Sequence, residues 1–238
     1  MSAAAPRRFW REAAAVPRDG AWAVELDGRP VRTPAGAPFL APTRALAEAA
    51  AAEWDAQGDR PDPRGMPVTR GVNTAVDRVA PQHAAVAEAV AAYGGSDLLC
   101  YRAPRPDALV DRQAEAWDPV LDWAEARWSI AFVRVEGVMH AAQPAATLAA
   151  LRMEVARRDA YALAALHDLT ALSGSLLLAL AVAEDALPAE DAWARSRIDE
   201  TFQVEQWGED AEAAAAAEAK RADFLAAVRF DSLLKDRA

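Results

Sequence analysis

Two acidic pairs near the C-terminus have the residue types that acid–base chemistry uses. The carboxylates are adjacent at Asp199-Glu200 and again at Glu209-Asp210. A catalytic pair requires two environments that push the pKa values of the carboxylates apart. Both pairs fall in a stretch that has the composition of a charged helix face, where both carboxylates of a pair are solvated. We therefore expect no catalytic residue among them.

The thiol and the imidazoles do not form a recognisable site either. Cys100 lies in the apolar run DLLCYRA, while His83, His140 and His167 are scattered along the chain. A nucleophile needs a neighbouring base, a cysteine in apolar surroundings is usually buried and inert, and no His or Cys pair has zinc-ligand spacing. The glycine-rich segments YGGSD and SGS lack the lysine that follows a phosphate loop. We expect no metal, no cofactor and no small-molecule substrate.

The acidic stretch RIDETFQVEQWGED, residues 197–210, is unusual because it also holds aromatic side chains. At roughly 100° per residue, a helix places Ile198, Thr201 and Phe202 on one side. The residues on the other side are Asp199, Glu200, Gln203, Gln206 and Trp207.

Two interpretations of this polar side compete. In the first, Trp207 covers a neighbouring helix of the same chain and the amides satisfy backbone groups or cap the break at Gly208. In the second, the polar side is a recognition surface, because tryptophan beside hydrogen-bonding and charged groups is typical of protein-binding hot spots.

Composition and charge exclude several classes of protein. The chain has 238 residues, and its 36 acids and 26 bases give a formal net charge of -10. Such a charge repels phosphate backbones and anionic lipids, so we expect no nucleic-acid binding. The longest apolar run, residues 172–183, is shorter than the roughly 20 residues that span a bilayer, so we expect no membrane insertion. One cysteine and no recognisable signal segment indicate a soluble, intracellular protein.

The elements that position these residues differ between the two ends of the chain. Trp22, Val24 and Leu26 alternate with small or polar residues, which indicates a strand with one apolar face. Asp27-Gly28 then has the composition of a hairpin turn, because glycine accepts a positive φ. A helix capped by Thr43 follows, and a second helix begins at about residue 69 and stops at Pro81.

Almost all of the chain beyond residue 80 has helical character, with a short apolar run at 130–135 that is compatible with a strand. We predict an α+β fold, with a small N-terminal mixed α/β domain of antiparallel strands (1–80) and a larger all-helical C-terminal domain (81–238). The predicted helices of the second domain are 82–93, 107–128, 145–156, 159–182, 189–207 and 210–229.

Six segments occur in an order and at a spacing that match one known family. They are LDGRPVRTPAG, PTRALAEAAAAEWDAQ, MPVTRGVNTAVDRV, DLLCYRA, QAEAWDPVLDW and DETFQVEQWGED. Together they resemble the ATP12 family, the ATP synthase assembly chaperones that bind the α subunit of the F1 sector. The resemblance extends from about residue 8 to about residue 230, and the ordered set is specific although each motif alone is weak.

This resemblance implies a chaperone and not an enzyme. Members of the family hold the free α subunit before it joins the β subunit and shield a surface that would otherwise aggregate. An acidic residue of the C-terminal motif is important in the family, and it falls here on Asp199 or Glu200. The chain shows no clear presequence, which implies a bacterial, cytoplasmic member, with the mitochondrial matrix as the location of a eukaryotic one.

We therefore expect the α subunit as partner and the polar side of 197–207, with Asp199, Glu200, Gln203, Gln206 and Trp207, as part of the binding surface. Two alternatives remain open at this point. The first is a small-molecule enzyme with a site between the two domains. The second is that the polar side forms only an intramolecular contact, and the partner docks on the N-terminal sheet.

Overall fold

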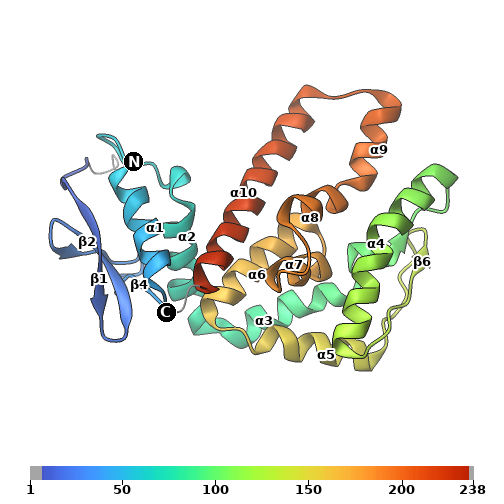
Figure 1. Cartoon of the computed structure of the whole chain (residues 1–238), viewed down its shortest axis with the longest axis horizontal. Coiled ribbons are helices and arrows are strands. Elements are labelled where there is room, and N and C mark those ends of the chain that lie inside the picture. Colours follow the sequence, from blue (N-terminus) through green and yellow to red (C-terminus); the bar gives the residue numbers. More distant parts are fainter. Residues whose placement is uncertain (1–6, 236–238) are drawn as a thin grey trace. The chain divides into compact units, whose positions relative to one another are not determined.

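A computed structural model describes residues 7–235, which form two compact units (Figure 1). The first unit contains the described residues up to His83 together with 159–165 and those from Arg229 onward, and the second contains 84–158 and 166–228. The boundary at residue 80 stays a prediction. The small antiparallel sheet near the N-terminus and the larger helical part confirm the predicted α+β fold.

The strands are short, and the helices make up most of the chain. The strands are β1 (Ala13–Arg18), β2 (Ala21–Leu26), β3 (Arg29–Pro30), β4 (Leu40–Ala41), β5 (Tyr101–Arg102) and β6 (Val135–Glu136). The α-helices are α1 (Arg44–Asp55), α2 (Pro67–Thr74), α3 (His83–Ala92), α4 (Asp107–Trp128), α5 (Ala145–Ala156), α6 (Ala160–Ser173), α7 (Leu176–Ala183), α8 (Ala189–Ser196), α9 (Ile198–Trp207) and α10 (Ala211–Lys235).

The sheet of the first unit is organised around β2. Strand β1 pairs antiparallel with one edge of β2, and β3 and β4 pair antiparallel with the other edge. The predicted turn at Asp27-Gly28 is present, with φ of 47° and 78°. A second Asp-Gly turn, Asp19-Gly20, joins β1 to β2 with φ of 50° and 78°. Both turns have the two positive φ values of a type I′ hairpin.

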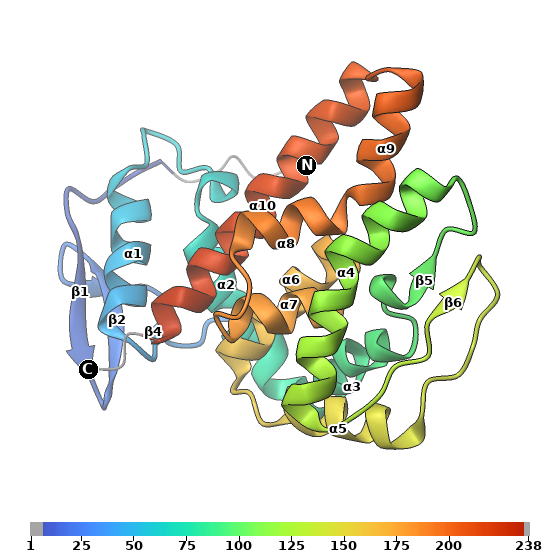
Figure 2. The ribbon, with the colours of Figure 1, turned by 45° about the vertical axis from the view of Figure 1, so that its right-hand side comes forward.

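Helix α1 packs against one face of this sheet, and α2 lies on the other side of α1 (Figures 1 and 2). As predicted, Thr43 caps α1, because its side chain accepts a hydrogen bond from the backbone N–H of Leu46. Val24 and Leu46 are buried in the core between sheet and helix, and the C-terminal residues Phe230 and Leu234 of α10 complete that core.

The predicted helix from residue 69 to Pro81 is only partly correct. The α-helix ends at Thr74, a π-helical turn follows at Ala75–Val79, and a 3-10 turn at Ala80–Gln82 leads directly into α3. The predicted stop at Pro81 is wrong, because Pro81 falls in the first turn of a helical segment. The backbone N–H groups of a first turn have no partner within the helix, so the missing N–H of proline breaks no hydrogen bond there. Asp77 of the π turn accepts hydrogen bonds from Thr33 and Ala35.

The second unit is built around α7, whose eight residues are all buried. The predicted helix 159–182 is divided into α6 and α7 at Gly174, which has a φ of +73°. The predicted helix 189–207 is likewise divided into α8 and α9 at Arg197. Helix α4 continues through Pro119. The predicted strand at 130–135 is reduced to β6, which pairs parallel with β5.

Asp97 is a fully buried carboxylate that holds the start of α7. It accepts hydrogen bonds from the Ser175 hydroxyl at 2.7 Å and from the backbone N–H groups of Leu177 and Leu99 at 3.1 Å each. Burial is the largest effect on this group and raises its pKa to about 6, although these donors favour the ionised form.

This raised pKa predicts a pH-dependent contribution to stability. The folded protein holds the Asp97 proton more tightly than the unfolded chain does. The protonated Asp97 side chain therefore makes its full contribution to the free energy of unfolding below the ordinary pKa of 3.8, and this contribution is lost as the pH rises through about 6. Between pH 4.5 and 7.5, the free energy of unfolding of the wild type relative to Asp97→Asn should fall by about 2 kcal/mol. Urea unfolding at both pH values measures this difference, and a constant difference would contradict the assignment.

Candidate functional site

Helix α9 is fixed to α4 along one side. Ile198 and Phe202 are buried, and between them Asp199 accepts a 2.5 Å hydrogen bond from the side-chain amide of Gln113 on α4. Gln113 is only 1% exposed, and its carbonyl oxygen accepts a hydrogen bond from the backbone N–H of Ala103. Since both ends of the amide are engaged, Gln113 places the first turn of α9 in one position.

Arg112 strengthens the same contact further along α9. Its guanidinium lies over the ring of Phe202, 5.4 Å from the centroid, and donates a 2.9 Å hydrogen bond to Glu205. This hydrogen bond is the main reason that the pKa of Glu205 lies below its ordinary value. The side of α9 that faces α4 therefore contains Ile198, Asp199, Phe202 and Glu205, which recur at helical spacing.

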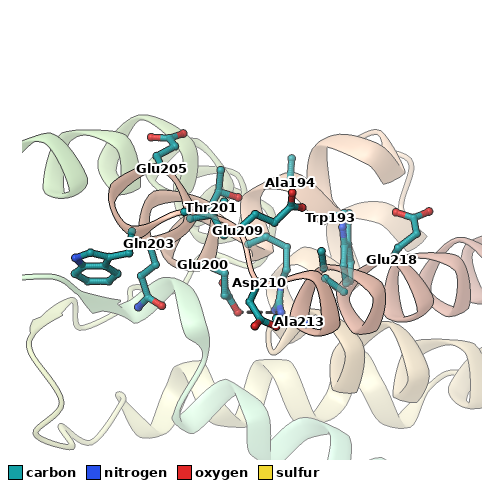
Figure 3. A pocket seen from close by; sticks show the side chains of 16 residues that line it. Trp193, Ala194, Glu200, Thr201, Gln203, Glu205, Glu209, Asp210, Ala213 and Glu218 are labelled. Carbon is teal, nitrogen blue, oxygen red and sulfur yellow. Dashed lines mark hydrogen bonds and ion pairs between the residues drawn. The ribbon is translucent and has the colours of Figure 1, made fainter.

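The opposite side of α9 projects away from α4. Glu200, Gln203, Val204 and Trp207 follow one another at positions i, i+3, i+4 and i+7, the spacing of one helix face. All four are exposed, with Trp207 at 80% and Val204 at 45%. In Figure 3, Glu200 and Gln203 point to one side of the helix and Glu205 points to the other.

A tight turn leads from this face into α10. Gly208 ends α9 with a φ of +88°, a conformation that an L side chain rarely adopts, and its N–H donates to the carbonyl of Val204. Asp210 then accepts a 2.8 Å hydrogen bond from the backbone N–H of Ala213, which caps the start of α10. The turn therefore brings the exposed face of α9 next to the first turns of α10.

These two helices and the end of α8 enclose a groove of about 680 Å³ within the second unit (Figure 3). Its apolar lining comes from Trp193 and Ala194 of α8, from Val204 and Trp207 of α9 and from a strip of alanines on α10. The remaining lining residues are mostly charged, with five carboxylates and one guanidinium: Glu200, Glu205, Glu209, Asp210, Glu218 and Arg197.

Arg197 forms the end of the groove nearest α8. Its guanidinium lies 5.1 Å from the centroid of the Trp193 ring, and Nη1 is 3.0 Å from Oε1 of Glu200. Trp193 is buried and in turn packs on Phe224 of α10, with 5.6 Å between ring centroids. Glu200 is thus held at the mouth of the groove and keeps more than half of its side chain exposed.

The structure divides the five predicted binding residues. Glu200, Gln203 and Trp207 line the groove, whereas Asp199 is engaged by Gln113 on the α4 side, and Gln206 is exposed without lining the groove. The exposure of Trp207 shows that the interpretation in which it covers a neighbouring helix is wrong. Their assignment as binding residues stays a prediction.

Sequence reasoning missed the apolar lining of the groove. Val204 stands at i+4 from Glu200, so the helical spacing was enough to place it beside the polar residues. Ala213, Ala214 and Ala217 gave no such signal, because an alanine tract only indicates a good helix. Their contribution depends on the turn at 208–210, which brings α10 alongside α9.

The structure agrees with the expected environment of Cys100, which is buried; burial raises the pKa of its thiol to about 12. His83 lies on α3 and His167 on α6, and His140 lies in the loop between β6 and α5. Within residues 7–235, no group of three or more His, Cys, Asp and Glu side chains is arranged to hold a metal ion. No helix in the described part of the chain is long and apolar enough to cross a membrane.

Comparisons with known proteins give one consistent family. The family described as ATP12 chaperone protein matches residues 7–125. The mitochondrial protein atp12 of Schizosaccharomyces pombe is 23% identical over 214 residues, which cover 85% of this chain and 74% of the relative.

Solved structures agree along almost the whole chain. Atp12 from Paracoccus denitrificans is 48% identical, with a TM-score of 0.93 and coverage of 96% of this chain and 98% of that one. The Atu1473 protein of Agrobacterium tumefaciens is 46% identical, with a TM-score of 0.91 and coverage of 96% and 86%. The chain belongs to the ATP12 chaperone family, and the resemblance seen in the sequence is confirmed.

The two adjacent acids should differ in their effect on stability. Asp199→Ala leaves the buried Gln113 amide without its acceptor and should lower the free energy of unfolding by about 1–3 kcal/mol. Glu200→Ala removes only an exposed ion pair and should cost less than about 1 kcal/mol. Urea unfolding of the two variants tests this, and equal losses would show that Asp199 does not hold α9 on α4.

Proposed function

We propose that this chain is an assembly chaperone of ATP synthase that binds the free α subunit of the F1 sector. It holds this subunit through the groove between α9 and α10 and prevents its aggregation until the β subunit takes its place. Membership of the ATP12 family supports the class of function. The groove, with Glu200, Gln203 and Trp207 in its lining, supports the position of the binding surface.

The exposure of Trp207 is the observation that carries the proposal. An indole that is 80% exposed beside Val204 leaves apolar surface in water, and contiguous surface of this kind marks interaction sites. Tryptophan is also among the residues most enriched at hot spots, the few interface positions that contribute most of the binding energy. Because α9 is held on α4, the backbone that carries the ring is ordered before binding.

The groove also suits a partner that must later be released. Its apolar lining is small, and carboxylates surround it, which is the arrangement of an apolar interface centre with a polar rim. Such an interface binds through a few anchors and not through a large buried area. A partner subunit with a larger complementary surface can therefore displace the chaperone.

The proposed function has a definite location and involves no catalysis. We place the protein in the bacterial cytoplasm, or in the mitochondrial matrix for a eukaryotic member. Catalysis is not part of this function: the thiol of Cys100 is buried and protonated, and the carboxylates of the groove are paired with arginines, cap α10 or stand in solvent.

Variants of the groove should weaken the complex without unfolding the protein. Trp207→Ala removes the apolar anchor and Glu200→Lys reverses a charge at the mouth, so each should reduce affinity for the purified α subunit by about thirtyfold or more. Glu115→Lys is the matched control, because Glu115 is exposed on α4 and does not line the groove. Sizing-column titration of α subunit against each variant measures the affinities.

Two results would decide against the proposal in different ways. If the wild-type protein forms no complex and leaves the solubility of the α subunit unchanged, the proposed function is wrong. If the complex forms but Trp207→Ala and Glu200→Lys bind like Glu115→Lys, the groove is wrong, and docking on the N-terminal sheet becomes the better account.

A further inference from the structure

The walls of the groove restrict the backbone conformation of whatever binds there. Both long walls are helices, α9 and α10, whose backbone N–H and C=O groups are engaged within the helices. A bound β-strand gains its affinity from a row of unpaired backbone groups at a sheet edge, and helical walls offer none. Apolar grooves between helices instead accept one face of another helix, through side chains at i, i+3 or i+4, and i+7.

The lining of α10 suits this kind of packing. Ala213, Ala214 and Ala217 recur at helical spacing and have short side chains, so a second helix can approach closely along this strip. Val204 and Trp207 stand opposite on α9. The groove volume of about 680 Å³ has room for a few large side chains and not for a whole folded element.

The charges of the groove define the chemistry of the segment that fits it. Five carboxylates line the groove, and three of them are paired with arginines: Glu200 with Arg197, Glu205 with Arg112 and Glu218 with Arg221. The carboxylates of Glu209 and Asp210 leave the lining with an excess of negative charge. Glu209 stands exposed at the turn between the helices. A second copy of this chain, with a net charge of -10, would bring carboxylates against carboxylates. A segment with lysine or arginine beside apolar residues is complementary to the carboxylates and the apolar lining of the groove.

We propose that the groove binds an amphipathic helix of its client, with two or three large apolar side chains on one face and lysine or arginine next to that face. This inference rests on the proposed function, because it names the kind of α-subunit segment that the groove takes. The apolar face packs between Trp207 and the alanines of α10, and the basic residues pair with the carboxylates at the mouth, among them the exposed Glu200 and Glu209.

Photocrosslinking within the complex tests both the place and the conformation. p-Benzoylphenylalanine is introduced at Gln203, which lines the groove, and as a control at Gln206, which is exposed on the same helix outside it. Each protein is irradiated with purified α subunit after the complex has been isolated on a sizing column. Gln203 should crosslink at least about tenfold more than Gln206, to a segment whose crosslinked residues are three, four or seven apart with lysine or arginine adjacent.

A second pair of variants tests the packing without a crosslinker. Ala217→Trp fills the groove, whereas Ala215→Trp places the same side chain on the opposite face of α10, and both positions are exposed. The first should weaken binding of the α subunit by at least about tenfold, and the second should change it less than about twofold. Equal affinities would show that the groove is not filled in the complex.

The outcomes separate this inference from the proposed function. If no complex can be isolated, both are overturned. If the complex forms and Gln203 crosslinks to residues that alternate, as in a strand, or to an acidic segment, the helical client segment is wrong while the chaperone function stands. If the complex forms and Gln206 crosslinks as well as Gln203, the groove is not the contact.

Discussion

The hydrogen bond between Gln113 and Asp199 is the constraint on which the candidate site depends. The amide of Gln113 is buried, and the backbone of Ala103 fixes its orientation, so its N–H groups point at the start of α9. Together with the burial of Ile198 and Phe202, this fixes the rotation of α9 about its own axis. The residues half a turn away must then face outward. The exposed face that carries Trp207 is therefore a consequence of how the opposite face is held.

A site of this kind combines rigidity with exposed apolar surface. Exposed tryptophan is a liability for solubility, and the carboxylates that surround the groove offset it by keeping this surface hydrated and by repelling other copies of the chain. Because α9 and α10 are joined by a turn with a defined geometry at Gly208, the two helices lose little backbone conformational entropy when a partner binds. Under the proposed function, such a surface would bind the α subunit firmly through few contacts and could still be exchanged.

Local patterns predicted much of the fold and only part of the site. The Asp27-Gly28 hairpin and the Thr43 cap followed from turn and capping chemistry, and the same chemistry at Asp19-Gly20 marks the first hairpin that was missed. Helical spacing separated Phe202 from the polar side of α9. It did not distinguish Asp199 from Glu200, because the partner of Asp199 lies 86 residues earlier in the chain. The groove depends on the turn at 208–210, which brings α10 alongside α9 in a geometry that the sequence pattern did not reveal.

Hydroxyl-radical footprinting of the complex with the α subunit tests the central claim most directly, since it measures the exposure of individual side chains. In the free protein, Trp207 and Met139 are 80% and 78% exposed, so both should be oxidised rapidly, and Met139 on the loop after β6 serves as an internal control outside the groove. On binding, the oxidation rate of Trp207 should fall severalfold while that of Met139 stays constant. An unchanged rate at Trp207, with protection appearing at Trp22 on the N-terminal sheet, would contradict this account.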